Sequence, residues 1–328
     1  MEPNSIVIRR AEKSDFQSLV KLYEEVWPDV PYDKEKKANF VFNESEGIQY
    51  CAEMDGEIIG SRVSFFMNFY YGKRPLKCIQ VGDTCTRKDC RGRGVLSRMN
   101  ESLLHDFFYE SGGDLIWNIS VDASRRVNEK WGWKYIESLA TLLMVCRPAH
   151  VLFKIGFRPS LLLGSVDWDQ ENHECQINDS VLDERENEID KYQRLHVKYD
   201  SETIKWRLKS QSGIKVYDDA QNGVILYKIG IKCGMTFVLI GEVFAKNYDY
   251  QTFKKLIKGL RKETGADIIK TAVSLGHPLL KHYRKVGFIY NPRNKFLNHG
   301  VRVETDEMKE LCFNPQNWAI SMLDVDTF

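Results

Sequence analysis

The segment that most constrains the fold of this chain is a glycine-containing stretch at residues 91–96, with the sequence RGRGVL. It follows a run of strand-forming residues at 77–86 and precedes an amphipathic helical pattern that starts at Val95. Glycines let a backbone approach a ligand closely, and the unpaired amides at the start of a helix favour phosphate. Arginine side chains add donors suited to a pyrophosphate. The order strand, loop, helix therefore predicts an α/β fold that binds a phosphate-bearing ligand.

The rest of the first half supplies further strands and helices. Asp55-Gly56 separates two apolar runs, which is typical of a tight hairpin between antiparallel strands. The patterns predict, in order, a strand at 5–10, a helix after Asp15, strands at 50–54 and 58–66, a strand at 77–86, a helix from Val95 to about Glu110, a strand at 114–121, and one strand within 133–147.

The second half repeats part of this order. A Gly-Asp-Leu-Ile stretch at 113–116 is followed by Gly132-Trp133, and an Ala-Asp-Ile-Ile stretch at 266–269 is followed by Gly287-Phe288. Each stretch comes after an amphipathic helix that ends in glycine, which indicates an internal duplication. Residues 164–190 carry many acidic and asparagine residues with little apolar periodicity. We therefore predict tandem domains at residues 1–150 and 189–328, joined by a linker at 151–188.

Composition excludes several classes of protein. The chain of 328 residues has a net charge of +1, so no overall field attracts it to nucleic acid or to an anionic membrane. Its eight cysteines are scattered without a CxxC pair, so we expect reduced thiols and no metal site. The N-terminus lacks a signal-peptide pattern, and no stretch reaches the ~18 apolar residues that span a bilayer. We expect a cytoplasmic protein without an integral membrane segment.

At residues 91–96 the chain resembles the GNAT (Gcn5-related N-acetyltransferase) superfamily. The cofactor loop of that family has Arg or Gln, then Gly three residues later, then Gly or Ala two residues further on. Arg91, Gly94 and Leu96 occupy these positions, and Leu96 departs from the usual small residue. The hairpin and the two Gly-aromatic pairs also fall where this fold expects them. The resemblance covers most of residues 5–147 and, more loosely, residues 190–328.

This resemblance implies a twisted mixed sheet whose fourth and fifth strands part to admit the pantetheine arm of acetyl-CoA. Residues 245–250 of the second half lack the loop glycines, so we expect one CoA per chain. A dinucleotide-binding interpretation of Gly92, Gly94 and Asp114 is weaker, because Ser97 replaces the third glycine and the upstream strands form a hairpin. The implied cofactor-binding residues are Thr84, Cys85, Thr86, Arg91, Gly92, Arg93, Gly94, Val95, Leu96 and Asn128.

Acyl transfer to an amine needs a group that collects the amine proton and a proton for the departing thiolate. Asp83 precedes the cofactor-binding segment and is a candidate base, although it serves equally well as a structural carboxylate. In the tail, Asp324, Asp326 or the terminal carboxylate is a further candidate, and a solvated terminus is the simpler interpretation. Many relatives donate the proton from a tyrosine whose position here holds Asn128. The matching residue of the second half is Tyr283, for which a core role is the simpler interpretation.

These features predict an N-acyltransferase that moves an acetyl group from acetyl-CoA to a primary amine of a small molecule. Tandem chains with a similar tail resemble acetyltransferases of polysaccharide biosynthesis, which implies an amino sugar, or a nucleotide-linked amino sugar, as acceptor. The alternatives are an acetyltransferase of a protein or antibiotic amine and a catalytically silent CoA-binding protein. The sequence leaves the oligomeric state open.

Overall fold

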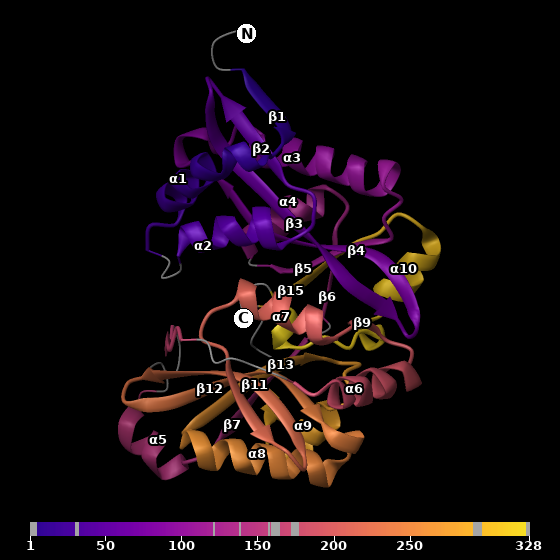
Figure 1. The fold of residues 1–328 in the computed structure, drawn as a ribbon. Coiled ribbons are helices and arrows are strands. Elements are labelled where there is room, and N and C mark those ends of the chain that lie inside the picture. Colours follow the sequence, from indigo (N-terminus) through magenta and orange to yellow (C-terminus); the bar gives the residue numbers. More distant parts are fainter. Residues whose placement is uncertain are drawn as a thin grey trace. The chain divides into compact units, whose positions relative to one another are not determined.

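The computed structural model describes residues 5–29, 33–120, 122–137, 139–156, 158, 165–171, 177–290 and 297–325. The chain divides into two compact units, each built on its own mixed sheet, as the predicted α/β fold class requires (Figure 1). Among the described residues, no helix is both long and apolar enough to cross a bilayer. Unit 1 comprises Met1–Phe69, Pro75–Ile136 and Asn298–Phe313, and unit 2 comprises Tyr70–Arg74, Glu137–Leu297 and Asn314–Phe328.

The sheet of unit 1 has the strand order β1-β2-β3-β4-β5-β15-β6. Its strands are β1 (Ile6–Arg10), β2 (Tyr50–Met54), β3 (Glu57–Tyr71), β4 (Arg74–Thr86), β5 (Leu115–Ser120), β6 (Lys134–Ile136) and β15 (Asn298–Arg302). The pairs β1–β2 and β2–β3 are antiparallel, whereas β4 and β5 are parallel. Asp55 and Gly56 join β2 to β3 with φ of 53° and 82°, which confirms the predicted hairpin.

Helices cover both faces of this sheet. On one face Val95 and Met99 of the third helix pack with Val81 of β4, and on the other Leu19 of the first helix packs with Cys51 of β2. The helices are α1 (Phe16–Val26), α2 (Lys34–Asn39), α3 (Val95–Leu104, continued by the π-helical turn His105–Glu110), α4 (Asp122–Lys130) and α10 (Asp306–Cys312).

The sheet of unit 2 has the order β10-β11-β12-β13-β7-β14, and β8 pairs with β11. Apolar residues of α8 pack on this sheet, and α8 and α9 lie on the same face (Figure 1). The strands of this sheet are β7 (Leu139–Val145), β8 (Asp167–Trp168), β10 (Lys215–Asp219), β11 (Gly223–Lys232), β12 (Met235–Ala245), β13 (Ile268–Ser274) and β14 (Ile289–Tyr290), whereas β9 (Leu195–Val197) pairs with β3 in the other sheet. The helices are α5 (Pro148–Ile155), α6 (Asp179–Lys191), α7 (Ser201–Ser210), α8 (Tyr250–Thr264) and α9 (Leu280–Val286).

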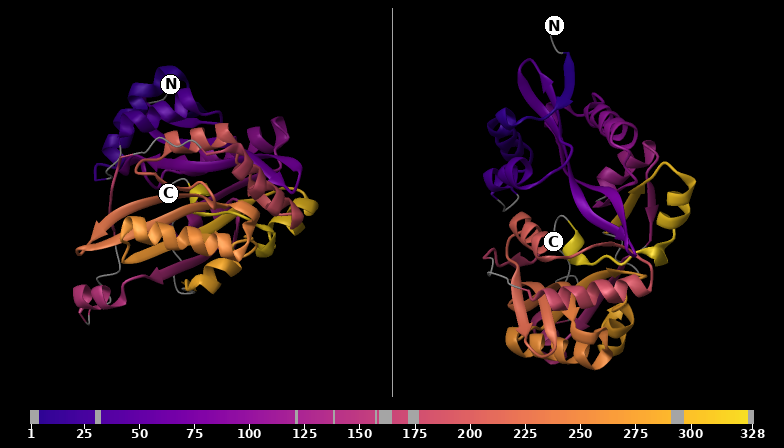
Figure 2. Two further views of the ribbon diagram at one scale, coloured as in Figure 1. Left: turned by 60° about the horizontal axis from the view of Figure 1, so that its bottom comes forward. Right: turned by 45° about the vertical axis from the view of Figure 1, so that its right-hand side comes forward.

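Each half of the sequence contributes a strand to the sheet built mainly by the other half, which the sequence did not predict. β7 pairs with β13 and β14 in unit 2, while β15 pairs with β5 and β6 in unit 1. Figure 2 shows the yellow segment at 298–313 alongside the magenta elements of unit 1. The compact units therefore do not coincide with the contiguous ranges 1–150 and 189–328. The single strand expected within 133–147 is in fact two, β6 and β7, one in each sheet.

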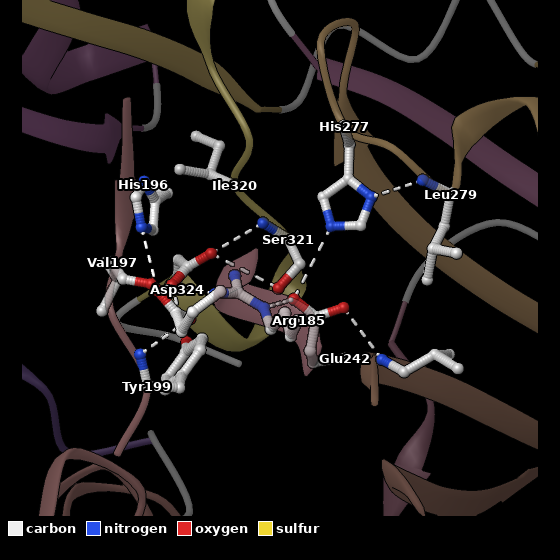
Figure 3. Close-up of polar contacts among 12 residues, drawn as sticks. Arg185, His196, Val197, Tyr199, Glu242, His277, Leu279, Ile320, Ser321 and Asp324 are labelled. Carbon is white, nitrogen blue, oxygen red and sulfur yellow. Dashed lines mark hydrogen bonds and ion pairs between the residues drawn. The ribbon is translucent and has the colours of Figure 1, made fainter. Parts of the chain in front are cut away.

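The expectation of a linker at 151–188 is wrong for the residues of α6. This helix buries Val181, Leu182 and Ile189, and it also buries the charged pair Arg185 and Glu186. Arg185 Nε donates to Glu242 Oε2 at 3.2 Å, and its Nη1 donates to Glu186 Oε1 at 2.6 Å (Figure 3). Charged residues made the segment look solvent-exposed in the sequence, but ion pairing lets them take core positions.

Candidate functional site

The strands β4 and β5 separate partway along their length. Their parallel pairing runs from Cys78 opposite Leu115 to Gln80 opposite Trp117. β4 continues to Thr86, and β5 continues to Ser120 while pairing with β15 on its other edge. A wedge-shaped opening between two neighbouring strands is thus built into the sheet of unit 1, as the resemblance implied.

A backbone irregularity at Asp83 marks the start of the separated part of β4. Asp83 has φ of 41°, in the left-handed region that is rare for residues other than glycine. Before Asp83, Val81 packs with the buried residues of α3, and after it, Cys85 packs with the buried residues of α1. The odd-numbered side chains of β4 therefore move from the α3 face of the sheet to the α1 face at Asp83. Asp83 Oδ2 lies 3.0 Å from Lys37 Nζ of α2, with only 15% of the carboxylate side chain exposed. The Asp83 carboxylate is thus paired with a cation.

The glycine loop joins β4 to α3 with its glycines in left-handed conformations. Gly92 and Gly94 have φ of 81° and 73°, and a Cβ built at either would meet no atom within 4 Å. Gly94 is the N-cap of α3 and offers no side chain to the amides of the first helical turn. Val95 is buried and anchors this end of the helix. The loop therefore presents an uncapped helix N-terminus to open space, which favours an anion.

A cavity of about 610 Å³ lies beside this loop. Every predicted cofactor-binding residue except Arg93 and Asn128 lines it. Cys85 is among the lining residues, and burial raises the pKa of its thiol well above the ordinary value, so it remains protonated and is a poor nucleophile. The lining consists of Val26, Trp27, Thr84, Cys85, Thr86, Cys90, Arg91, Gly92, Gly94, Val95, Leu96, Ser97 and Val127.

Arg93 and Asn128 occupy other positions. Arg93 Nη1 lies 3.7 Å from the sulfur of Met54. Asn128 is 1% exposed, and its Nδ2 donates to the hydroxyl of Tyr135 at 3.1 Å. Ser120 Oγ donates to the same hydroxyl, also at 3.1 Å. The Asn128 side chain thus serves to hold Tyr135, while its neighbour Val127 lines the cavity.

Tyr135 is a candidate that sequence reasoning missed. Its hydroxyl accepts two hydrogen bonds, and no described residue accepts the phenolic proton in a bond. The hydroxyl lies within hydrogen-bond distance of Asn128, the position where relatives were expected to carry a tyrosine. Arg125 lies over the Tyr135 ring at 5.0 Å. No local sequence pattern predicts this contact, because Tyr135 lies on β6 and Asn128 lies on α4.

Arg62 is a second residue that sequence reasoning missed. It lies on β3 within an apolar strand and is 2% exposed. Its Nη1 donates to Thr84 Oγ1 at 2.5 Å, and Thr84 lines the cavity. Burial lowers the pKa of Arg62 to about 10, so it remains a cation at neutral pH. A charged residue in the middle of an otherwise apolar strand was the available signal.

The remaining catalytic candidates do not reach an accessible site. Tyr283 has 0% exposure in the core of unit 2, where its ring packs edge-on against Phe253 and Phe288. A substrate would have to open this core to reach the hydroxyl, so Tyr283 is a core tyrosine. Asp324 is also fully buried and accepts a hydrogen bond from the Tyr199 hydroxyl at 2.6 Å (Figure 3). Asp326 lies outside the described residues.

The corresponding loop of unit 2 differs in the way that matters for anion binding. Between β12 and α8, Asn247 and Tyr248 have positive φ where the first loop has glycines. The N-cap of α8 is Asp249, whose carboxylate accepts from the amides of Gln251 and Thr252. Because these amides are already hydrogen bonded to a negative group, this helix start does not favour a phosphate.

Comparisons with known proteins agree with the fold and with the loop. Residues 7–136 match the family described as acetyltransferase (GNAT) domain. A Bacillus subtilis protein named probable hydrolase YhcX is 37% identical over 136 residues, which cover 38% of this chain and 25% of that protein. The chain thus spans about a quarter of the length of this curated relative.

Several solved structures resemble most of the chain, among them the two described next. A GCN5-related N-acetyltransferase from Anabaena variabilis matches with a TM-score of 0.65 and 12% identity, and the match covers 91% of this chain and 73% of the Anabaena chain. A GCN5-related N-acetyltransferase from Kribbella flavida matches with a TM-score of 0.61 and 10% identity, and the match covers 91% of this chain and 72% of the Kribbella chain. At this identity the likeness establishes the fold alone.

Proposed function

Since residues 7–136 match the family described as acetyltransferase (GNAT) domain, we propose that this chain is an acyl-CoA-dependent N-acetyltransferase. The observation that carries the proposal is the cavity where β4 leaves β5, next to the uncapped start of α3. A ligand that fills it needs a long uncharged arm for the strand opening and a diphosphate for the helix terminus. Acetyl-CoA has both parts, and it supplies the acetyl group as a thioester.

In this proposal the chain holds acetyl-CoA mainly through its backbone. The amides from Gly92 to Leu96 bind the diphosphate, and the residues 84–86 of β4 bind the pantetheine arm. Arg91 and Arg126 are exposed and add positive charge near the phosphates. Arg91 Nε already donates to the carbonyl of Thr86 at 3.2 Å, which fixes its stem beside the cavity.

The amine must lose a proton, and the departing sulfur must have its charge neutralised. We retain Asp83 as the candidate base, because it lies at the point where β4 separates and its carboxylate is held by Lys37. We propose Tyr135 as the proton donor in place of Asn128, since its phenolic proton is not used by a described residue. Backbone amides of β4 can stabilise the oxyanion, a contribution of about 3 kcal/mol per donor in other enzymes.

The proposed acceptor is a small molecule. We propose a primary amine of an amino sugar, free or nucleotide-linked, on the resemblance to tandem acetyltransferases of polysaccharide biosynthesis. The second unit, with its capped helix α8, supports the proposal of one cofactor per chain. That this unit derives from a duplicated GNAT domain stays a prediction.

Calorimetric titration with CoA and a thiol-release assay with acetyl-CoA test the proposal. The panel should contain glucosamine, a nucleotide-linked amino sugar, an aminoglycoside and a lysine peptide. We expect micromolar CoA binding at one site per chain, and thiol release that depends on one class of amine. Binding without release for any amine would favour a silent CoA-binding protein, and the absence of CoA binding would refute the proposal.

A further inference from the structure

Arg62 is a buried cation that has no counter-ion among the residues that the structure describes. Its guanidinium is 2% exposed, and among the described residues its only hydrogen-bond partner is the neutral hydroxyl of Thr84. The atoms Nε and Nη2 have no hydrogen-bond partner in this part of the chain. No described carboxylate forms an ion pair with it, in contrast to Arg185 of unit 2, which is buried between Glu186 and Glu242.

Such an arrangement is costly for the folded protein. Removing a guanidinium from water is unfavourable unless opposite charge and full hydrogen bonding compensate for it. Burial is the main cause of the lowered pKa of Arg62, and only Tyr135 opposes it. Since none of the described residues supplies a negative group, the structure is prepared for one that arrives with a ligand or forms during a reaction.

The position of Arg62 indicates which negative group this is. Thr84, its partner, lies on β4 just after the irregular residue Asp83 and lines the cavity. Arg62 thus reaches the cavity through Thr84, on the part of β4 that has left β5, where the thioester of the cofactor belongs under the proposed function.

We infer that Arg62 stabilises the thiolate that leaves when the acetyl group is transferred. This inference rests on the proposed function and assigns a residue to it. The amine nitrogen attacks the thioester carbon, the new C–N bond forms, and the C–S bond breaks with its electron pair passing to sulfur. The ammonium proton goes to the base, and the CoA thiolate is held by Arg62 until Tyr135 or water protonates it. The step consumes acetyl-CoA and amine only.

A preorganised cation suits this step. The charge on sulfur develops only as the C–S bond breaks, so a cation already fixed in a dry site stabilises the transition state more than the ground state. In the resting protein the same charge is unfavourable. Arg62 thus has the properties of a functional residue that lowers the stability of the fold.

The experiment measures the thiol pKa of CoA bound to the full chain. The thiolate absorbs in the ultraviolet, and subtracting the spectrum of the desulfo-CoA complex removes the contribution of the protein cysteines. For a thiolate roughly 6 Å from the guanidinium and an effective dielectric constant of about 20, the Arg62 charge lowers the thiol pKa by about 2 units, a roughly hundredfold gain in thiolate. We therefore expect a lower pKa for bound CoA than for free CoA.

Variants separate this role from a structural one. Arg62→Met should raise the thiol pKa of bound CoA by about 2 units, whereas Arg62→Lys keeps the charge and should retain most of the effect. Arg98→Met removes an exposed arginine of α3 and should change nothing. Because Met replaces an unpaired buried cation, the melting temperature of Arg62→Met should equal or exceed that of the wild type.

Each other outcome has a defined meaning. Equal thiol pKa values in the wild type and Arg62→Met, or a wild-type value no lower than that of free CoA, would overturn the inference while leaving CoA binding intact. A rise in KM confined to acidic amines, with the thiol pKa unchanged, would show that Arg62 binds an anionic acceptor and would also overturn it. Failure of the wild type to bind CoA would instead refute the proposed function.

Discussion

Replacing Gly94 with tryptophan tests the position of the cofactor most directly. Gly94 is the N-cap of α3, lines the cavity, and has φ of 73° with no atom within 4 Å of a built Cβ. An indole at this position has room to form without a clash in the fold. It would occupy space beside the helix N-terminus, where the diphosphate is proposed to bind. The same substitution at Gly112, which has φ of 63° and equally open surroundings but does not line the cavity, is the matched control.

The expected magnitudes follow from the geometry. A side chain in the left-handed region costs about 1–2 kcal/mol of folding stability, and this cost applies to both variants. Their melting temperatures should therefore fall by similar amounts. Loss of the diphosphate contacts should weaken CoA binding at least hundredfold in Gly94→Trp, equivalent to about 2.7 kcal/mol, with no change in Gly112→Trp. Calorimetric titration measures the binding and differential scanning fluorimetry the stability. A folded Gly94→Trp variant that binds CoA within threefold of the wild type would refute the assigned site.

Three further predictions concern Tyr135, Glu242 and Asp249. Tyr135→Phe should lower kcat about 10²-fold or more at unchanged CoA affinity, and a wild-type kcat would exclude Tyr135 as the acid. Burial would raise the pKa of Glu242, but the charge of Arg185 outweighs this effect and lowers the pKa to about 2, below the ordinary 4.5. This carboxylate therefore stabilises the fold above pH ~4.5, and its contribution is lost as the pH falls toward 2. Glu242→Gln should cost about 3–5 kcal/mol of stability at pH 7, and urea titration should show that this variant loses less stability on acidification than the wild type. Asp249→Ala removes the cap of α8 and should cost about 1 kcal/mol of stability without affecting CoA affinity, and reduced affinity would contradict the assignment of the cofactor to unit 1.

Local chemistry made several features predictable. The loop at 91–96 could be placed between a strand and a helix because glycine conformation, helix amides and apolar periodicity are properties of neighbouring residues. The Asp55-Gly56 hairpin followed from the same kind of evidence, because only a few residues accept the backbone angles of a tight turn. The residues 84–86 could be assigned to the cavity through a family resemblance that rests on this loop.

Contacts between distant parts of the chain were decided only by the tertiary structure. The exchange of β7 and β15 between the sheets, the burial of Arg185 in α6 and the meeting of Tyr135 with Asn128 depend on which strands pair, and strand pairing leaves little trace in local sequence. The same holds for Arg62, whose missing counter-ion is visible only once its neighbours are known. The sequence by itself predicted a phosphate-binding loop, because such a prediction depends on consecutive amides. The environment of the reacting atoms depends on side chains brought together from β3, β4, α4 and β6, and only folding sets their distances.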